Sequence, residues 1–281
     1  MSLSFQRCKQ LVVLELTTER KFYAYSILAL AGILLTYMLY NAYYTTDGLH
    51  HDLQEQIATE GLIIFSLMTS AYYFRKINSN DSRLESLMLP VSPVERLIVA
   101  LFFTLVLYQI AYLVIYFFCA GTAFYVDETL QHGNRFYLFD GRREIDSSFL
   151  KMLFGMVTLG LATGATFRKL PVVKAILIMA LLFIANNMIS QHLSRFLMKE
   201  TQLPAKLQEP VLGQVAKKVE LMNASPFGHW YLKSQTASGE TVSVFTINPP
   251  ASVELLTSAA GFLFPFALMY LVVLKLREQE I

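Results

Sequence analysis

Residues 50–55, HHDLQE, hold the densest group of possible metal ligands in this sequence. Imidazole and carboxylate groups are common ligands of zinc and other divalent ions, which makes His50, His51, Asp52 and Glu55 the first residues to consider. The chain contains neither HExxH nor CxxC, and this group has no ligand spacing of that kind. We therefore interpret these side chains as solvated loop residues and expect no metal site.

The sequence also lacks the patterns that carry catalysis. It has no GxxxxGK[ST] run, the P-loop that cradles nucleotide phosphates, and no Ser/Lys pair or cluster of acids at one membrane depth. We expect this chain to have no catalytic residue and no cofactor of its own. The strongest polar pair inside an apolar run is Asn186-Asn187. Hydrogen bonding between helices is its commoner role, and contact with a transported substrate is the functional alternative.

The elements that must position these residues are apolar and long. The chain has 281 residues, 54% of them hydrophobic and 16% charged, against roughly 25% charged in soluble domains. Crossing a bilayer takes about 20 apolar residues. Six runs qualify: 22–44, 57–74, 97–118, 149–167, 172–190 and 253–274. We predict an all-α polytopic membrane protein with six transmembrane helices, in which residues 1–281 form one transmembrane domain.

Lysine and arginine set the orientation of such a chain. The segments on the N-terminal side of the membrane are rich in both, whereas the first loop on the other side, 45–56, has neither. This predicts that both chain ends are cytoplasmic (N-in, C-in). The formal net charge of +2 gives no indication of nucleic-acid binding. No run carries an Asp, Glu, His or Arg at mid-depth, where ion-coupled carriers usually keep one.

The predicted extracytoplasmic insert, 191–252, is the only large polar region. Val211, Val215, Val219 and Met222 recur at near-helical spacing. Residues 230–236 and 241–247 flank Ser238-Gly239 and predict a hairpin. The insert is therefore expected to be small and of mixed structure. A second hairpin is predicted at Asp140-Gly141.

The cytoplasmic loop 75–96 carries two helix-start signals. Ser82 with Glu85, and Ser92 with Glu95, each have the spacing of a capping box, and Pro93 stands at the first helical position of the second. Between them, the apolar side chains at 84, 87 and 88 share one helix face. A helix lying flat on the lipid and a helix docked in the groove of a cytoplasmic partner both fit this face.

Two further patterns concern packing. Gly155, Gly160 and Gly164 lie in one run, the last two at GxxxG spacing, which lets helix backbones approach closely. Residues 4–21 precede the first run. They fit a cytoplasmic extension of that helix or a helix lying in the membrane interface.

Several of these segments resemble the permease subunits of type-2 ATP-binding cassette (ABC) exporters. The segment FRKINSNDSRLESLMLPVSPVERLIVALF is similar to that family's LPxSxxE stretch before the third span. ATFRKLPVVK between runs four and five, the tail LKLREQEI and the basic helix before the first span also fit. The long insert 191–252 departs from the compact members.

The resemblance implies that two permease subunits, identical or different, form a membrane unit in the bacterial cytoplasmic (inner) membrane. Two separate ATPase subunits would hold ATP and Mg²⁺ and dock on the loop between spans two and three. By position, the contact would be made by Asp81, Ser82, Arg83, Leu84, Glu85, Leu87 and Met88. The alternative from another class is a non-transporting scaffold or sensor that binds a partner through 191–252.

Overall fold

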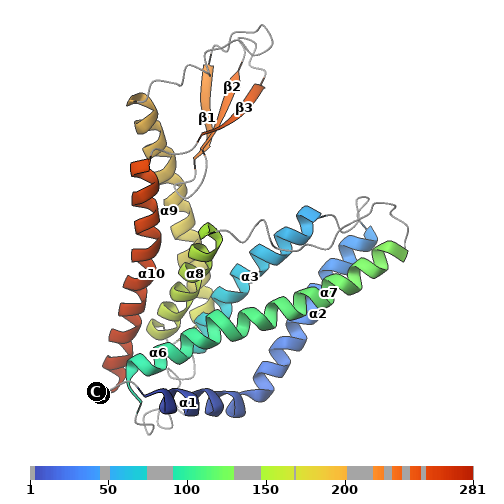
Figure 1. The fold of residues 1–281 in the computed structure, drawn as a ribbon, viewed down its shortest axis with the longest axis vertical. Coiled ribbons are helices and arrows are strands. Elements are labelled where there is room, and N and C mark those ends of the chain that lie inside the picture. Colours follow the sequence, from blue (N-terminus) through green and yellow to red (C-terminus); the bar gives the residue numbers. More distant parts are fainter. Residues whose placement is uncertain are drawn as a thin grey trace. The chain divides into compact units, whose positions relative to one another are not determined.

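The computed structural model describes residues 4–44, 51–74, 91–129, 147–167, 169–200, 218–224, 230–235, 241–247 and 251–280. The chain divides into two units, one made of Met1–Ile176 with Phe264–Ile281 and the other of Leu177–Leu263. The helices of the described part are α1 (Phe5–Thr18), α2 (Arg20–Tyr44), α3 (His51–Tyr73), α6 (Pro93–Phe102), the π-helix η1 (Phe103–Leu107), α7 (Tyr108–Thr129), α8 (Ser147–Thr166), α9 (Pro171–Glu200) and α10 (Ala251–Glu280) (Figure 1).

Three helices in the described part are long and apolar enough to cross a membrane. They are Tyr23–Tyr44, Pro93–Val126 and Phe149–Thr166, and Pro171–Ala185 is a shorter apolar helix. Many large apolar side chains on them are exposed, among them Leu28 on α2 and Val114 on α7. Contiguous exposed apolar surface of this kind is rare on soluble monomers. These helices indicate a membrane protein.

The six predicted runs all fall on helices, but their bounds differ from those predicted. The third run, 97–118, lies within an apolar helix that extends from Pro93 to Val126. The second run was predicted to follow a loop over 45–56, but α3 already begins at His51, where Asp52 suits the first helical turn. The plan of six crossings stays a prediction, as does the orientation. The hairpin predicted at 140–141 lies outside the described residues.

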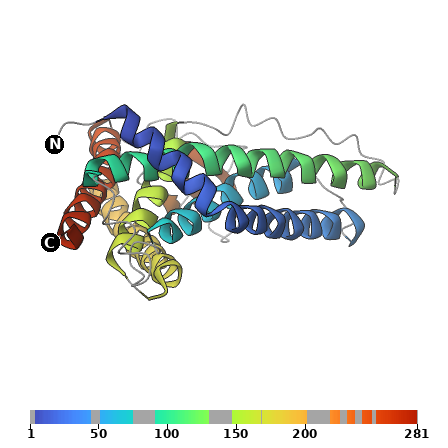
Figure 2. The same cartoon turned by 90° about the horizontal axis from the view of Figure 1, so that it is seen from below.

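The first unit packs its helices in two pairs. α2 lies beside α7, and α3 lies beside α8 (Figures 1 and 2). One apolar cluster joins α2, α3 and α7, with Met38, Ala58 and Tyr116 buried in it. A second joins α6, α8 and the last part of α10 through Ala100, Leu161 and Val272. α3 is therefore held between α7 on one side and α8 on another.

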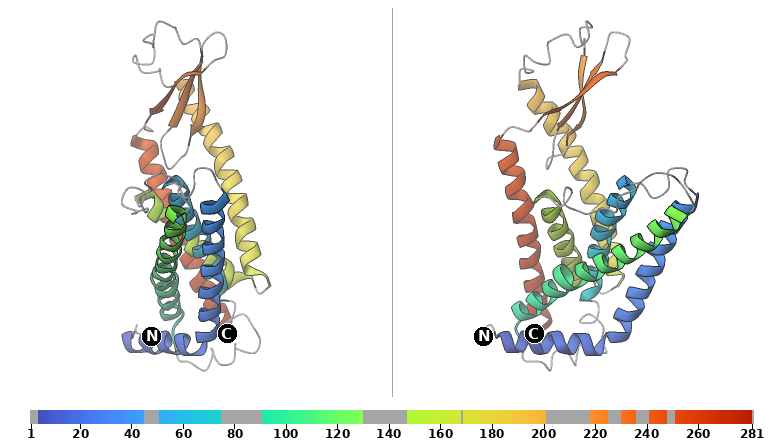
Figure 3. Two further views of the ribbon diagram at one scale, coloured as in Figure 1. Left: turned by 90° about the vertical axis from the view of Figure 1, so that its right-hand side faces the viewer. Right: turned by 45° about the vertical axis from the view of Figure 1, so that its right-hand side comes forward.

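α1 turns sharply into α2 at Glu19, so that it runs across the ends of the neighbouring helices (Figure 3). It packs against α6. The start of α1 and the end of α10 lie at the same end of the first unit (Figures 1 and 3).

The second unit contains a three-stranded antiparallel sheet in the order β1 (Lys218–Ala224), β2 (Trp230–Gln235), β3 (Thr241–Ile247). The predicted hairpin is present, with Trp230 opposite Ile247. The helical spacing of Val219 and Met222 was misleading, because both lie in β1. β-branched and apolar residues favour a strand when a neighbouring strand supplies hydrogen bonds, and β2 does so.

Candidate functional site: a junction at Glu95

The start of α6 is fixed by the capping box that its sequence indicates. The Glu95 backbone N–H donates to Ser92 Oγ at 3.3 Å, and the Ser92 backbone N–H donates to Glu95 Oε2 at 2.9 Å. Pro93 occupies the first turn. Two of the backbone N–H groups that a helix leaves unpaired at its start are thereby satisfied.

Glu95 does more than cap its own helix. Its other carboxylate oxygen, Oε1, accepts a hydrogen bond from the backbone N–H of Ser4 at 2.8 Å. Ser4 is the N-cap of α1, and its own side chain makes no cap hydrogen bond. A single carboxylate therefore serves the first backbone N–H of two helices, one oxygen for each. Both helices direct the positive end of their dipole at it.

Arg7, in the first turn of α1, completes this group. Its Nη2 lies 3.3 Å from Glu95 Oε1, and the exposed fractions of the two side chains are 29% for Arg7 and 0% for Glu95. A buried carboxylate is stable only when its oxygens are well paired. Ser4, Arg7 and Ser92 supply that pairing. We call the group of Ser4, Arg7, Ser92 and Glu95 the Glu95 junction.

A second contact holds the other end of α1. The Tyr23 hydroxyl, at the start of α2, donates to Glu15 Oε1 at 3.3 Å, and the Tyr23 ring lies 6.0 Å from that of Tyr108, centroid to centroid. The ring of Tyr23 stacks on Phe103, with the centroids 6.3 Å apart. One end of α1 is thus bonded to α6, and the other is bonded to Tyr23 of α2, whose ring packs on η1. The hydrogen bonds and the ion pair of the junction connect α1 to α6.

The glycines of α8 lie against α3. A Cβ at Gly164 would come within 2.6 Å of Ala71 O, and one at Gly160 within 2.8 Å of Leu67 O. No side chain fits at either position without backbone movement. The close approach therefore occurs within one chain. Gly155 differs, since a Cβ there meets nothing within 4 Å in the described part of the chain. Its predicted role in helix packing stays a prediction.

The remaining predicted site residues stay untested. Asp81, Ser82, Arg83, Leu84, Glu85, Leu87 and Met88 all lie outside the described residues. Asn186 and Asn187 lie on α9. The structure thus places the predicted cap residues Ser92, Pro93 and Glu95 in one site.

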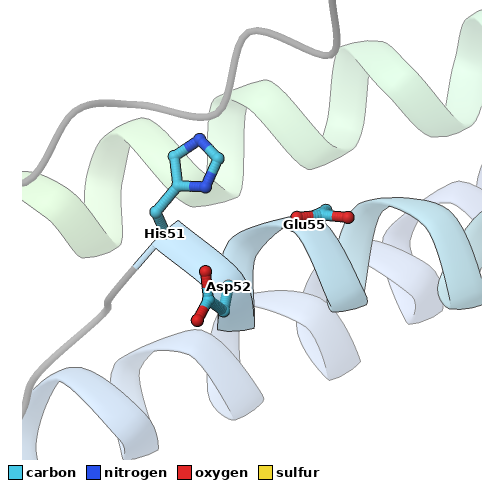
Figure 4. Close-up of side chains that lie close together, drawn as sticks. All are labelled: His51, Asp52 and Glu55. Atoms are coloured by element: carbon cyan, nitrogen blue, oxygen red, sulfur yellow. The ribbon is translucent and has the colours of Figure 1, made fainter. Parts of the chain in front are cut away.

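His51, Asp52 and Glu55 project from the first turns of α3 (Figure 4). Their possible ligand atoms lie within 4.8 Å of one another, and His51 and Asp52 are exposed. Acids at a helix start are favoured by the helix dipole without any ion. The prediction of a solvated loop is wrong in its secondary structure, since these residues are helical.

Sequence reasoning missed the partners of Glu95. Nothing in the spacing connects Ser4 or Arg7 with a residue 91 positions further along. It also missed a buried polar group formed by Ser66, Thr104 and Gln109. A signal was available for the second case: Gln109 is a long amide side chain within an apolar run.

Comparison of the chain with protein-family models, with curated proteins and with solved structures found no match.

Proposed function

We propose that this chain is the membrane permease subunit of an ATP-driven exporter of the type-2 ABC kind. The observation that carries the proposal is the Glu95 junction. The loop that the resemblance assigns to the ATPase leads directly into Ser92, and Ser92 is hydrogen-bonded to the buried Glu95. A force applied to that loop would reach α6 and α1 together, because Glu95 holds both.

The proposed topology has six crossings with both chain ends in the cytoplasm. Its support is the distribution of basic residues in the first unit. The Arg and Lys residues of α1, the start of α2, the start of α6 and the end of α10 belong to the end where α1 lies: Arg7, Lys9, Arg20, Lys21, Arg96, Lys275 and Arg277. Basic residues accumulate on the cytoplasmic side of membrane proteins.

The mechanism follows from how the helices are joined. ATP binding would close two ATPase subunits and displace the loop on each of two permease subunits. α6 would move with the loop, and α1 would move with α6 through Glu95. α3 packs too closely on Gly160 and Gly164 of α8 to separate from it without a large cost, so that α3 and α8 would move as one body.

Purification with a partner tests the proposal. Tagged full-length protein is extracted from its native membrane in mild detergent, alongside the double variant Leu84→Asp/Leu87→Asp. We expect mass spectrometry to identify an ATPase with a P-loop in the wild-type sample and to find it depleted from the variant. The physical reason is that two new carboxylates in an apolar docking face would be desolvated without partners.

The matched control is Gln6→Asp/Gln10→Asp, which adds the same two charges on the exposed side of α1. It is expected to retain the ATPase. Loss of the ATPase from both variants would mean that added negative charge, and not the change at the loop, weakens the complex. Absence of any ATPase from the wild type, even after cross-linking in intact membranes, would reject the permease function and favour the scaffold.

A further inference from the structure

The long helix from Pro93 to Thr129 is interrupted by a π-helical turn, η1. The Tyr108 backbone N–H there bonds to Phe103 O, five residues back. A π turn accommodates one residue more than an α turn, is rare, and often coincides with functional sites and helix kinks. η1 separates α6, which carries the Glu95 junction, from α7, which packs on α2.

Side chains support the wide turn from inside the bundle. Gln109 Nε2 donates to Thr104 O at 2.7 Å, across the π turn, and to Ser66 Oγ on α3 at 2.7 Å. Thr104 Oγ1 donates to Ala100 O at 2.7 Å. Gln109 is 6% exposed, and Ser66 and Thr104 are fully buried. One amide group therefore joins a backbone carbonyl of η1 to α3.

Aromatic rings surround Phe103 of η1 in the described part of the chain. Phe103 packs on the aromatic rings of Tyr23, Tyr73 and Tyr108, with ring centroids about 6 Å apart. Ring contacts are weakly directional compared with hydrogen bonds, so such a cluster can shift while it stays in contact. Within the described residues, the side-chain amide of Gln109 joins the turn to α3 by hydrogen bonds.

We propose that η1 is a hinge between α6 and α7, and that Gln109 is the positioning residue that holds it in the observed form. When the side-chain amide of Gln109 no longer donates to Thr104 O, the extra residue of the π turn can shift into an adjacent turn of the helix. The change rotates α6, together with the Glu95 junction, relative to α7. The hinge belongs to the chain itself and needs neither nucleotide nor cargo, so its test is independent of the proposed function.

The test is a distance measurement between spin labels on full-length protein in lipid nanodiscs. One label pair, at positions 98 and 114, spans η1 from α6 to α7; both positions are exposed. The reference pair, at positions 33 and 114, lies on α2 and α7, which pack together. Cys8 and Cys119 are replaced first, as Cys8→Ser and Cys119→Ala, to leave no other label site. We expect a broader distance distribution for the pair across η1 than for the reference pair.

Two changes then act on the hinge in opposite directions. Deleting Val106, an exposed residue of η1, removes the extra residue and converts the π turn into an α-helical turn. α6 and α7 keep the faces by which they pack. We expect the distribution across η1 to narrow to the width of the reference pair. Gln109→Leu keeps the side-chain volume but cannot donate to Thr104 O or Ser66, and it should broaden the distribution or shift its centre.

The matched control is Thr104→Val, which removes a buried hydroxyl but keeps the carbonyl that Gln109 bonds. It should leave the distribution unchanged. If the distribution across η1 is as narrow as the reference in the wild type and in Gln109→Leu, the turn is a fixed bulge and the proposal is wrong. Should the deletion variant fail to fold, Gln109→Leu against Thr104→Val decides the question alone.

Discussion

Two helices of the first unit begin next to acidic side chains, and the two helix starts differ in burial. At α6, Glu95 is fully buried and bonded to Ser4, Ser92 and Arg7. At α3, Asp52 is exposed beside His51. The helix dipole favours an acid at both places. The buried acid at α6 joins two segments that lie 91 residues apart in the chain, whereas the acid at α3 is exposed to solvent. The exposed acid favours its own helix only.

Among the tests of this comparison, we expect the replacement of Glu95 to have the largest effect. Glu95→Ala leaves the first N–H of two helices and the Arg7 guanidinium without their acceptor. Hydrogen bonds to a charged group are the strong kind, so we expect α1 to undock and the maleimide labelling rate of Cys8 to rise at least about tenfold. Cys8 lies on α1 next to Arg7, and Cys119→Ala removes the other thiol.

The control for this change is Glu60→Ala, which removes an exposed acid from α3. Its Cys8 labelling should match the wild type. Equal labelling in Glu95→Ala and Glu60→Ala would show that Glu95 does not hold α1.

Removing the charge on α1 should have a smaller effect on the same measurement. Arg7→Met keeps an unbranched side chain against the protein but removes the ion pair, while the Ser4 hydrogen bond to Glu95 remains. Because Arg7 is partly exposed, we expect Cys8 labelling to rise only about threefold to tenfold. Lys9→Met, on the exposed side of α1, should change it little. If Lys9→Met raised Cys8 labelling as much as Arg7→Met, the cause would be the loss of positive charge on α1 in general and not the loss of the ion pair with Glu95.

Ser92→Ala separates the two functions of the junction. It removes the Oγ that accepts from the Glu95 N–H but leaves the Glu95 carboxylate bonded to Ser4. Loss of such a cap costs about 1 kcal/mol, which corresponds to roughly fivefold faster hydrogen exchange in the first turn of α6. Cys8 labelling should stay near the wild-type rate. A rise in labelling as large as in Glu95→Ala would show that the two helix starts cannot be uncoupled.

Asp52→Asn should have the smallest effect. An exposed charge in a first turn contributes within about 0.5 kcal/mol, and salt screens it. We expect the thermal unfolding midpoint in detergent to change by no more than a degree or two, the scale for a large domain. A larger loss, or one that added Zn²⁺ restores, would give the group of His51, Asp52 and Glu55 a structural role.

The sequence predicts local features of this fold better than distant contacts. The capping box at Ser92 and Glu95 was readable because its partners are three residues apart. The hairpin of β2 and β3 was readable for the same reason. The contacts of Ser4 and Arg7 with Glu95 could not be predicted, because no local pattern marks a partner on another helix. Nor could the π turn, which depends on packing around Phe103 and on Gln109. The sequence did not separate Gly155 from Gly160 and Gly164, because only the facing helix distinguishes them.

The distance along the chain between Ser4 and Glu95 sets an order of assembly. Synthesis proceeds from the N-terminus, so α1 leaves the ribosome well before its acceptor, 91 residues later, has been made. Until Glu95 emerges, the first backbone N–H of α1 lacks that carboxylate and Arg7 lacks that counter-ion. α1 therefore stays undocked from α6 while α2 and α3 are being synthesised. A chain interrupted before Glu95 would keep it in that state.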